Sequence, residues 1–173
     1  MNPITIITKR LALLPIAVEH ADAIFENFTS EITTYMYPKP AAHIEEVHDF
    51  IQSSLETMAT GTNLQMVITD IADSSFLGCI GLHRLDSPIP ELGIWLKKSA
   101  HGRGYGHEAI AALVDWARNN TDYRQLKYPV DERNQASRKI PVKLGGVVNE
   151  RYVTNGLGSN SLKILEYLIT IKS

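Results

Sequence analysis

Three alternating glycines and an arginine form the segment of the chain best suited to chemistry. Gly102, Gly104 and Gly106 frame Arg103 and stand between an apolar strand-like run and the apolar stripe of a helix. Glycine lets the backbone approach a ligand closely, and the first N–H groups of a helix lack intrahelical partners. Together with the positive end of the helix dipole, these groups attract anions, phosphate above all. The pattern therefore predicts a pyrophosphate site at residues 102–107, with an ordinary structural turn as the alternative.

Three better-known phosphate loops do not fit the spacing. The dinucleotide fingerprint needs a third glycine where this chain has His107. A Walker loop needs Lys followed by Ser or Thr after its last glycine, but Gly106 is followed by His107 and Glu108. The kinase loop joins two strands, whereas this one opens a helix. All three classes are excluded on sequence grounds.

The same segment resembles the acetyl-CoA-binding motif Q/R-x-x-G-x-G/A of the GNAT N-acetyltransferases. The chain reads His101-Gly102-Arg103-Gly104-Tyr105-Gly106 and continues His107-Glu108-Ala109, similar to the G-x-G-Y-x-x-E-A version of the RimJ/RimL-like branch. Residues 131–137 and 143–145 resemble the N-x-x-S…K-L-G helix of that branch, and residues 8–13 resemble its opening T-x-R-L-x-L strand. The resemblance covers nearly the whole chain. It implies an acetyl-CoA-dependent N-acetyltransferase in which a primary amine attacks the thioester directly, in a ternary complex.

Apolar periodicity predicts an α/β domain spanning residues 1–173. Strands are expected at 4–14, 64–69, 76–85, 91–97, 125–131, 147–153 and 162–171, and helices at 19–28, 44–58, from the glycine loop to about residue 120, and 134–144. This order indicates a mixed sheet flanked by helices. The resemblance implies a GNAT-like, mostly antiparallel sheet that is split between its central strands.

Pro129 lies within a predicted strand but cannot donate to a ladder, so it marks either a sheet edge, a strand end or the split. By resemblance, the pantetheine arm pairs with the strand across the split, through the backbone of Ile94, Trp95 and Leu96. The resemblance also places Asn134 on that arm and Ser137 near the departing thiolate. The alternative for Asn134 and Ser137 is ordinary helix capping.

This chain departs from the family pattern at two positions. Many GNAT members carry a tyrosine where this chain has Pro141, so a tyrosine cannot act as the general acid from that position. Gly146 replaces a usual aromatic residue.

An acceptor amine must lose a proton before it attacks. Glu91, at the start of the strand beside the expected slot, is the first candidate base, and His83, at the end of the preceding strand, is the second. Either side chain could equally be a solvated strand-end residue. Glu108 is interpreted as structural, because an acid favours the first turn of a helix.

Tyr35 and Tyr37 lie between the first two predicted helices, where the resembling family builds its acceptor site, although aromatic residues in loops also serve packing. No two of the six histidines have a metal-ligand spacing, so no metal is expected. The net charge of −2 excludes a general binder of nucleic acid or anionic membranes. The lone Cys79, in an apolar strand, predicts a buried inert thiol.

The N-terminus has no signal-peptide pattern and no apolar run is long enough to span a membrane, so a cytoplasmic location is expected. The final strand pair could serve a homodimer. Two other functions stay open on the sequence: a non-catalytic acyl-CoA-binding module, and a plain nucleotide binder. The acceptor amine is not defined by these residues.

Overall fold

A computed structural model describes residues 3–173. Its sheet has eight strands in the order β1-β2-β3-β4-β5-β6-β8-β7. The strands are β1 (Ile6–Ile7), β2 (Leu11–Pro15), β3 (Asn63–Asp70), β4 (Phe76–His83), β5 (Glu91–Leu96), β6 (Gln125–Asp131), β7 (Val147–Asn155) and β8 (Ser161–Thr170). The helices are α1 (Ala21–Asn27), α2 (Ile44–Ala59), α3 (Tyr105–Asn120) and α4 (Gln135–Lys143), with short 3-10 turns at Val18–His20, Ile32–Tyr35 and Lys98–Ala100. The predicted α/β fold class is confirmed.

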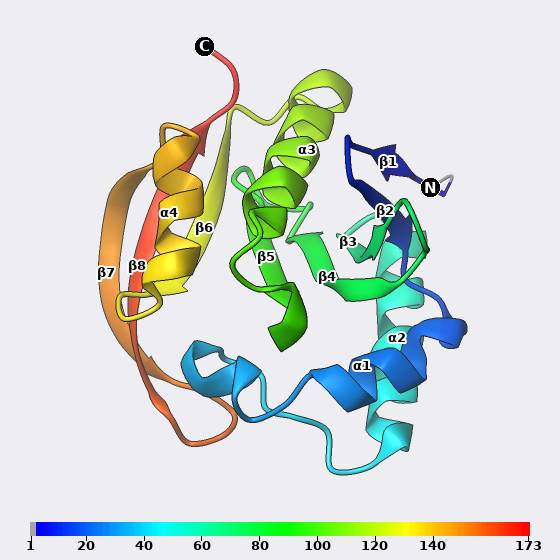
Figure 1. The fold of residues 1–173 in the computed structure, drawn as a ribbon. Helices are drawn as coiled ribbons and strands as arrows, with labels where there is room; N and C mark the ends of the chain where they lie inside the picture. The colour runs from blue at the N-terminus through cyan, green and yellow to red at the C-terminus, as the bar shows by residue number, and fades with distance from the viewer. Residues whose placement is uncertain (1–2) are drawn as a thin grey trace.

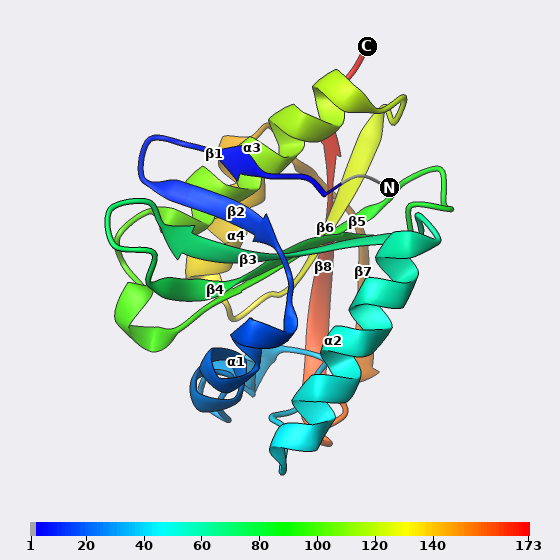
Figure 2. The same cartoon turned by 90° about the vertical axis from the view of Figure 1, so that its right-hand side faces the viewer.

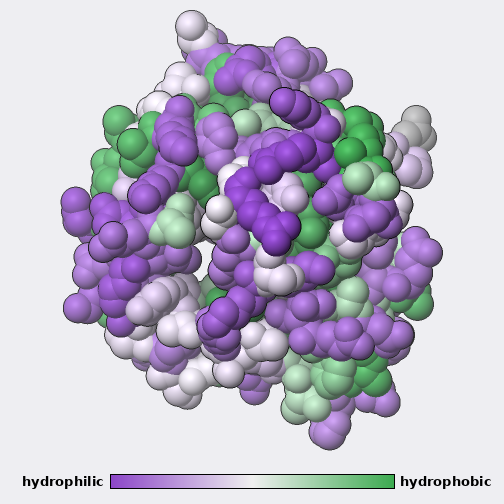
Figure 3. All heavy atoms as spheres, viewed as in Figure 1, coloured by the Kyte–Doolittle hydropathy of each residue, from purple (hydrophilic) through white to green (hydrophobic). Residues whose placement is uncertain are grey.

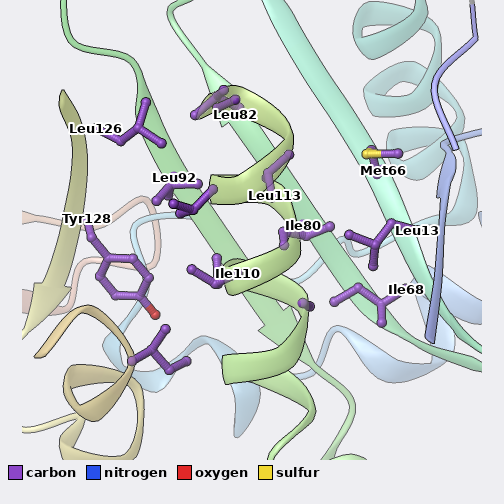
Figure 4. Packing of buried hydrophobic residues seen from close by; sticks show 14 of the residues in the cluster. Leu13, Met66, Ile68, Ile80, Leu82, Leu92, Ile110, Leu113, Leu126 and Tyr128 are labelled. Carbon is purple, nitrogen blue, oxygen red and sulfur yellow. The ribbon is translucent and has the colours of Figure 1, made fainter. Parts of the chain in front are cut away.

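The helices cover both faces of the sheet. α3 and α4 lie on one face, and α1 and α2 lie on the other (Figures 1 and 2). The apolar stripe of α3 is fully inside, since Ile110, Leu113 and Ala117 are 0% exposed. It packs on Ile80, Leu82 and their neighbours (Figure 4). Within residues 3–173, no helix combines the length and the apolar character needed to cross a membrane.

Two predicted elements differ from the structure. The single strand expected at residues 4–14 is a hairpin of β1 and β2, because Thr8 and Arg10 turn the chain to reach Glu108. The helix expected at 19–28 is a 3-10 turn followed by the seven-residue α1. Cys79 is 2% exposed on the α1 and α2 side, so its predicted burial is confirmed. Burial raises the pKa of its thiol.

The sheet is split between β5 and β6. These two parallel strands share the single register pair Glu91 and Lys127, with the Lys127 N–H donating to the Pro90 carbonyl at 2.8 Å. Pro129 is two residues further along β6, so its nitrogen is turned to the same side, where it has no N–H to offer. On the other side β6 pairs with β8 along its whole length, so Pro129 is neither at an edge nor at a strand end. The predicted split is confirmed, and the surface is hollowed between α3 and α4 (Figure 3).

Candidate active site

The glycine loop lies at the open end of the split, directly before α3. Gly102 and Gly104 have φ of +75° and +78°, and Gly104 is the N-cap residue. A side chain at either position is strained by this left-handed backbone rather than by crowding, because a Cβ at Gly102 would have nothing within 4 Å. Gly106 serves close packing instead, since its Cβ would come within 3.1 Å of the Ile140 side chain on α4.

The loop presents a row of free donors. Within residues 3–173, no backbone carbonyl accepts a hydrogen bond from the N–H groups of residues 102–107, and no side chain caps α3. A helix start with unpaired N–H groups carries a positive potential that favours an anion. The loop can therefore bind a phosphate group through its backbone.

The opening T-x-R segment fixes this loop from behind. The Glu108 carboxylate accepts hydrogen bonds from the Thr8 hydroxyl (2.6 Å), the Arg10 N–H (3.0 Å) and the Arg10 Nε (2.8 Å). Burial alone would raise the pKa of Glu108, but these hydrogen bonds outweigh it and lower the pKa. Arg10 also donates to the Arg103 carbonyl at 2.9 Å. The structural role predicted for Glu108 is thus an anchor between β1, β2 and α3.

The side chains of two loop residues, Tyr105 and His107, have different surroundings. Tyr105 is 8% exposed, and the Arg10 guanidinium lies 4.4 Å from the centre of its ring. His107 lines a hollow of about 760 Å³ between β1 and α3, which Gly104 also lines. The part of either residue that belongs to the predicted phosphate site is its backbone N–H. Arg103 is exposed.

The alternation of β5 separates the three residues predicted to contact a pantetheine arm. All residues of β5 have register partners in β4, but peptide groups along a strand alternate in direction. The Lys97 N–H donates to Leu77 in β4, whereas the Pro90 carbonyl accepts from Lys127 in β6, so the peptide groups of Ile94 and Leu96 are turned to the split. The peptide groups of Trp95 belong to the β4 ladder, and its indole packs 4.8 Å from Phe28 and 5.8 Å from Phe76, centroid to centroid. Trp95 therefore does not face the split, which corrects that part of the prediction.

A cavity of about 220 Å³ brings together residues from three separate elements. His101 after β5, Asn134 before α4 and Tyr35 between α1 and α2 all line it. His101 Nε2 lies 2.8 Å from the Leu96 carbonyl oxygen, one of the backbone groups turned to the split. Asn134 caps α4, because its side-chain oxygen accepts from the Ser137 N–H at 3.3 Å. The capping alternative for Asn134 thus coexists with a place in the cavity wall.

The loop that carries Tyr35 is held by several other elements. The Arg133 guanidinium lies 4.8 Å from the centre of the Tyr35 ring and forms a two-pronged ion pair with Asp131 at 2.8 and 2.7 Å. Arg133 holds the pKa of the buried Asp131 at about 2. The Asn160 amide donates to the Thr34 and Met36 carbonyls, each at 3.1 Å. Tyr37 is not among the residues lining the cavity, and its carbonyl accepts from the Leu157 N–H at 2.7 Å.

The two candidate bases lie together where β5 and β6 begin to part. Glu91 and His83 are register partners, and both are half-buried. Burial, followed by the nearby Glu166, raises the pKa of Glu91, while burial lowers the pKa of His83. A Cβ on Gly93 would lie 3.3 Å from His83 Nε2, so the imidazole rests on β5 beside the split. The raised pKa makes the Glu91 carboxylate a stronger base, whereas the lowered pKa makes His83 a weaker base that stays neutral and can accept a proton.

Ser137 has a partner that the sequence analysis missed. The Tyr128 hydroxyl lies 2.7 Å from Ser137 Oγ, and burial raises the pKa of Tyr128 to about 12. Tyr128 belongs to β6 and occupies an ordinary inward position in the strand pattern, so no local signal marks it. Only the docking of α4 on the sheet makes this contact.

Comparison with known proteins identifies the chain as an acyltransferase enzyme. Residues 10–147 match the acetyltransferase (GNAT) domain, and the chain belongs to this family. It is 27% identical, over 143 residues, to an uncharacterized N-acetyltransferase, p20, of Bacillus licheniformis, covering 79% of this chain and 78% of that protein.

Solved structures share the fold. A putative ribosomal-protein-serine acetyltransferase from Vibrio cholerae superposes with a TM-score of 0.82 at 16% identity, over 96% of this chain and 97% of the other. The spermidine N-acetyltransferase of Vibrio cholerae, solved with CoA and spermine, superposes with a TM-score of 0.79 at 16% identity, over 94% and 96%.

Proposed function

We propose that this protein transfers the acetyl group of acetyl-CoA to a primary amine. The observation that carries the proposal is the row of free N–H groups at residues 102–107, placed at the open end of a split sheet. A phosphate at the loop and a strand-like arm in the split fit one ligand that has both. The related spermidine acetyltransferase was solved with CoA, which supports the same choice.

The residues of the site fit acetyl-CoA part by part. The loop would hold the pyrophosphate, with Arg103 adding a charged donor. The peptide groups of Ile94 and Leu96 would pair with the pantetheine arm, after His101 Nε2 releases the Leu96 carbonyl. Asn134 would contact the arm from α4. The run from Glu91 to Leu96 spans about 17 Å at ~3.4 Å per residue, so the arm would direct the thioester toward the point where the strands meet.

The chemistry then requires positioning and proton transfer. Glu91 accepts a proton from the acceptor ammonium directly or through water, with His83 as the second candidate base. The freed amine forms a bond to the acetyl carbon as the carbon–sulfur bond breaks, and Ser137 stabilises the sulfur leaving with the electron pair. Orientation in a ternary complex supplies much of the rate enhancement, without a covalent enzyme intermediate.

The acceptor would lie on the α1 and α2 side, where Tyr35 lines the cavity beside His101 and Asn134. Relatives by fold act on different amines: one is named for ribosomal protein serine and another for spermidine. Both a peptide N-terminus and a small amine fit this proposal, because fold and cofactor site do not select the acceptor.

Calorimetric titration with acetyl-CoA and CoA, beside ATP and NAD, tests the proposal. We expect micromolar binding of both CoA species and no binding of NAD. In Gly104→Glu the affinity for CoA should fall at least tenfold, because the new carboxylate would occupy the phosphate site and repel the anion. Gly61→Glu is the matched control, since Gly61 also has φ of +75° and open space around it but lies far from the loop in sequence. Absence of CoA binding to the unmodified protein, or an equal loss in both variants, would overturn the proposal.

A further inference from the structure

Tyr128 and Ser137 form an isolated pair of hydroxyl groups beside the split. Tyr128 lies on β6, which borders the split, and Ser137 lies in the first turn of α4. Figure 4 shows the Tyr128 ring leaving β6 toward the space between this strand and α3. Their oxygens are 2.7 Å apart, and no further hydrogen bond of either hydroxyl occurs within residues 3–173.

The pair has one hydrogen-bond donor that is not used within it. Each hydroxyl carries one proton, and the bond between them uses one. One O–H therefore remains free, whichever oxygen donates to the other. The pair also lies at the N-terminal end of the nine-residue α4, where the helix dipole favours negative charge. One free donor in a positive, partly dry environment is suited to an anion.

We infer that Tyr128 and Ser137 act as one unit that donates a hydrogen bond to the CoA thiolate as it leaves. This inference rests on the proposed function and extends it by a catalytic partner for Ser137. The tyrosine comes from a sheet strand, whereas α4 itself contains Pro141 and no tyrosine.

The pair stabilises the leaving group rather than protonating it. The pKa of Tyr128 is raised to about 12 by burial, whereas an ordinary thiol has a pKa of about 8.5. Proton transfer from the phenol to the thiolate is therefore uphill by more than three pKa units. The electron pair of the carbon–sulfur bond stays on sulfur, the O–H holds it, and water supplies the proton after the acetyl group has moved to the amine.

A purely structural reading of the contact makes a different prediction. Buried tyrosine hydroxyls generally need a partner, and Ser137 satisfies that need. In that case, removal of either hydroxyl would loosen the docking of α4 and leave the chemistry of bound CoA unchanged. The ionisation of the CoA thiol separates the two possibilities.

The experiment titrates the thiol of CoA bound to the protein, by the ultraviolet absorbance of the thiolate against pH. A hydrogen bond to the CoA thiolate stabilises the ionised form, so it should lower the pKa of the bound thiol by about one unit from ~8.5. A hydroxyl left alone at either position still has its own O–H. We therefore expect Tyr128→Phe and Ser137→Ala each to reduce this shift, and the double variant to abolish it. Ser137→Thr keeps a hydroxyl and should keep the shift. With acetyl-CoA, kcat should fall about tenfold in the double variant and by less in either single variant, while KM for acetyl-CoA stays constant.

Tyr167→Phe is the matched control. Tyr167 faces Tyr128 across the β6–β8 register and is equally buried at 3% exposed, but its hydroxyl accepts from Arg138 at 3.2 Å. Its removal should leave the thiol pKa unchanged. An unshifted thiol in the unmodified protein, or a lowered pKa that survives in the double variant, would overturn the inference. Binding of CoA in the same experiment would still support the proposed function. Failure of CoA to bind the unmodified protein would overturn both. If Tyr128→Phe does not fold, the pair Ser137→Ala and Ser137→Thr carries the same test.

Discussion

Glu91 lies where β5 and β6 begin to part, in surroundings that disfavour its ionised form. Its pKa is raised by burial and by Glu166, so the folded protein holds its ionised form at a cost. A carboxylate with a raised pKa is a stronger base, which suits proton removal from an amine. Its sequence position at the start of a strand made it a candidate, but only the register with His83 and Lys127 shows that the candidates converge.

Replacing Glu91 should separate activity from stability. We expect Glu91→Gln to lower kcat/KM roughly 10²–10⁴-fold while acetyl-CoA binding is unchanged. Because the folded pKa of Glu91 is raised, ionisation of this carboxyl group destabilises the folded protein as pH rises through that pKa. The Glu91→Gln variant should therefore unfold at the same or a higher temperature than the unmodified protein at neutral pH. Steady-state kinetics and thermal melts measure both.

The pH profile distinguishes the two bases. In the unmodified protein kcat/KM should rise with pH through the raised pKa of Glu91, and Glu91→Gln should remove this limb while His83→Gln keeps it. Glu150→Gln is the control, since Glu150 faces Glu166 from β7 but is exposed. A limb that persists in Glu91→Gln and disappears in His83→Gln would assign the base to His83.

The β1–β2 turn contains a motif that the sequence shows, but its contact with α3 is visible only in the structure. Thr8 and Arg10 resemble the opening segment of the family. Both bind the Glu108 carboxylate on the first turn of α3, and Arg10 also donates to the Arg103 carbonyl in the glycine loop. The turn therefore secures the helix start whose N–H groups face the split. The segment expected to be one strand at residues 4–14 therefore forms two strands, β1 and β2.

Loss of this anchor should be measurable as stability. We expect Glu108→Gln to lower the free energy of unfolding by about 2 kcal/mol, or roughly 4–8 °C in the melting temperature. Glu45→Gln is the control, because Glu45 also lies in the first turn of a helix but is exposed. The folded pKa of Glu108 is lowered, so its contribution is present above the ordinary value and is lost as pH falls through the folded pKa. Urea unfolding at neutral and acidic pH should show the difference between the proteins shrinking on acidification; a constant difference would contradict the assignment.

The whole molecule consists of two half-sheets that share one parallel register pair. β1 to β5 carry α3 and the glycine loop, while β6, β8 and β7 carry α4, so a ligand in the split touches both halves. A ligand arm that pairs with β5 would complete the missing ladder. Binding should therefore be visible in the backbone at specific amides.

Amide hydrogen exchange followed by NMR tests this prediction. On addition of CoA, the N–H groups of Ile94 and Leu96 should exchange more slowly, because they are turned to the split. The Trp95 N–H already belongs to the β4 ladder and serves as the internal control, so its exchange should stay unchanged. Equal slowing at all three residues would indicate general stabilisation instead of pairing in the split.

Local patterns in the sequence determined the elements and the cofactor loop. The helix stripe of α3, the strand alternation and the glycine spacing act over a few residues, so they can be read without the fold. Contacts between distant segments depend on docking, and only the tertiary structure decided them. These include the partnership of Tyr128 with Ser137, the stacking of Arg133 on Tyr35, and the turning of Trp95 away from the split. The physical reason is that periodicity fixes which face a residue takes, whereas its partner is set by strand register and helix packing across the whole chain.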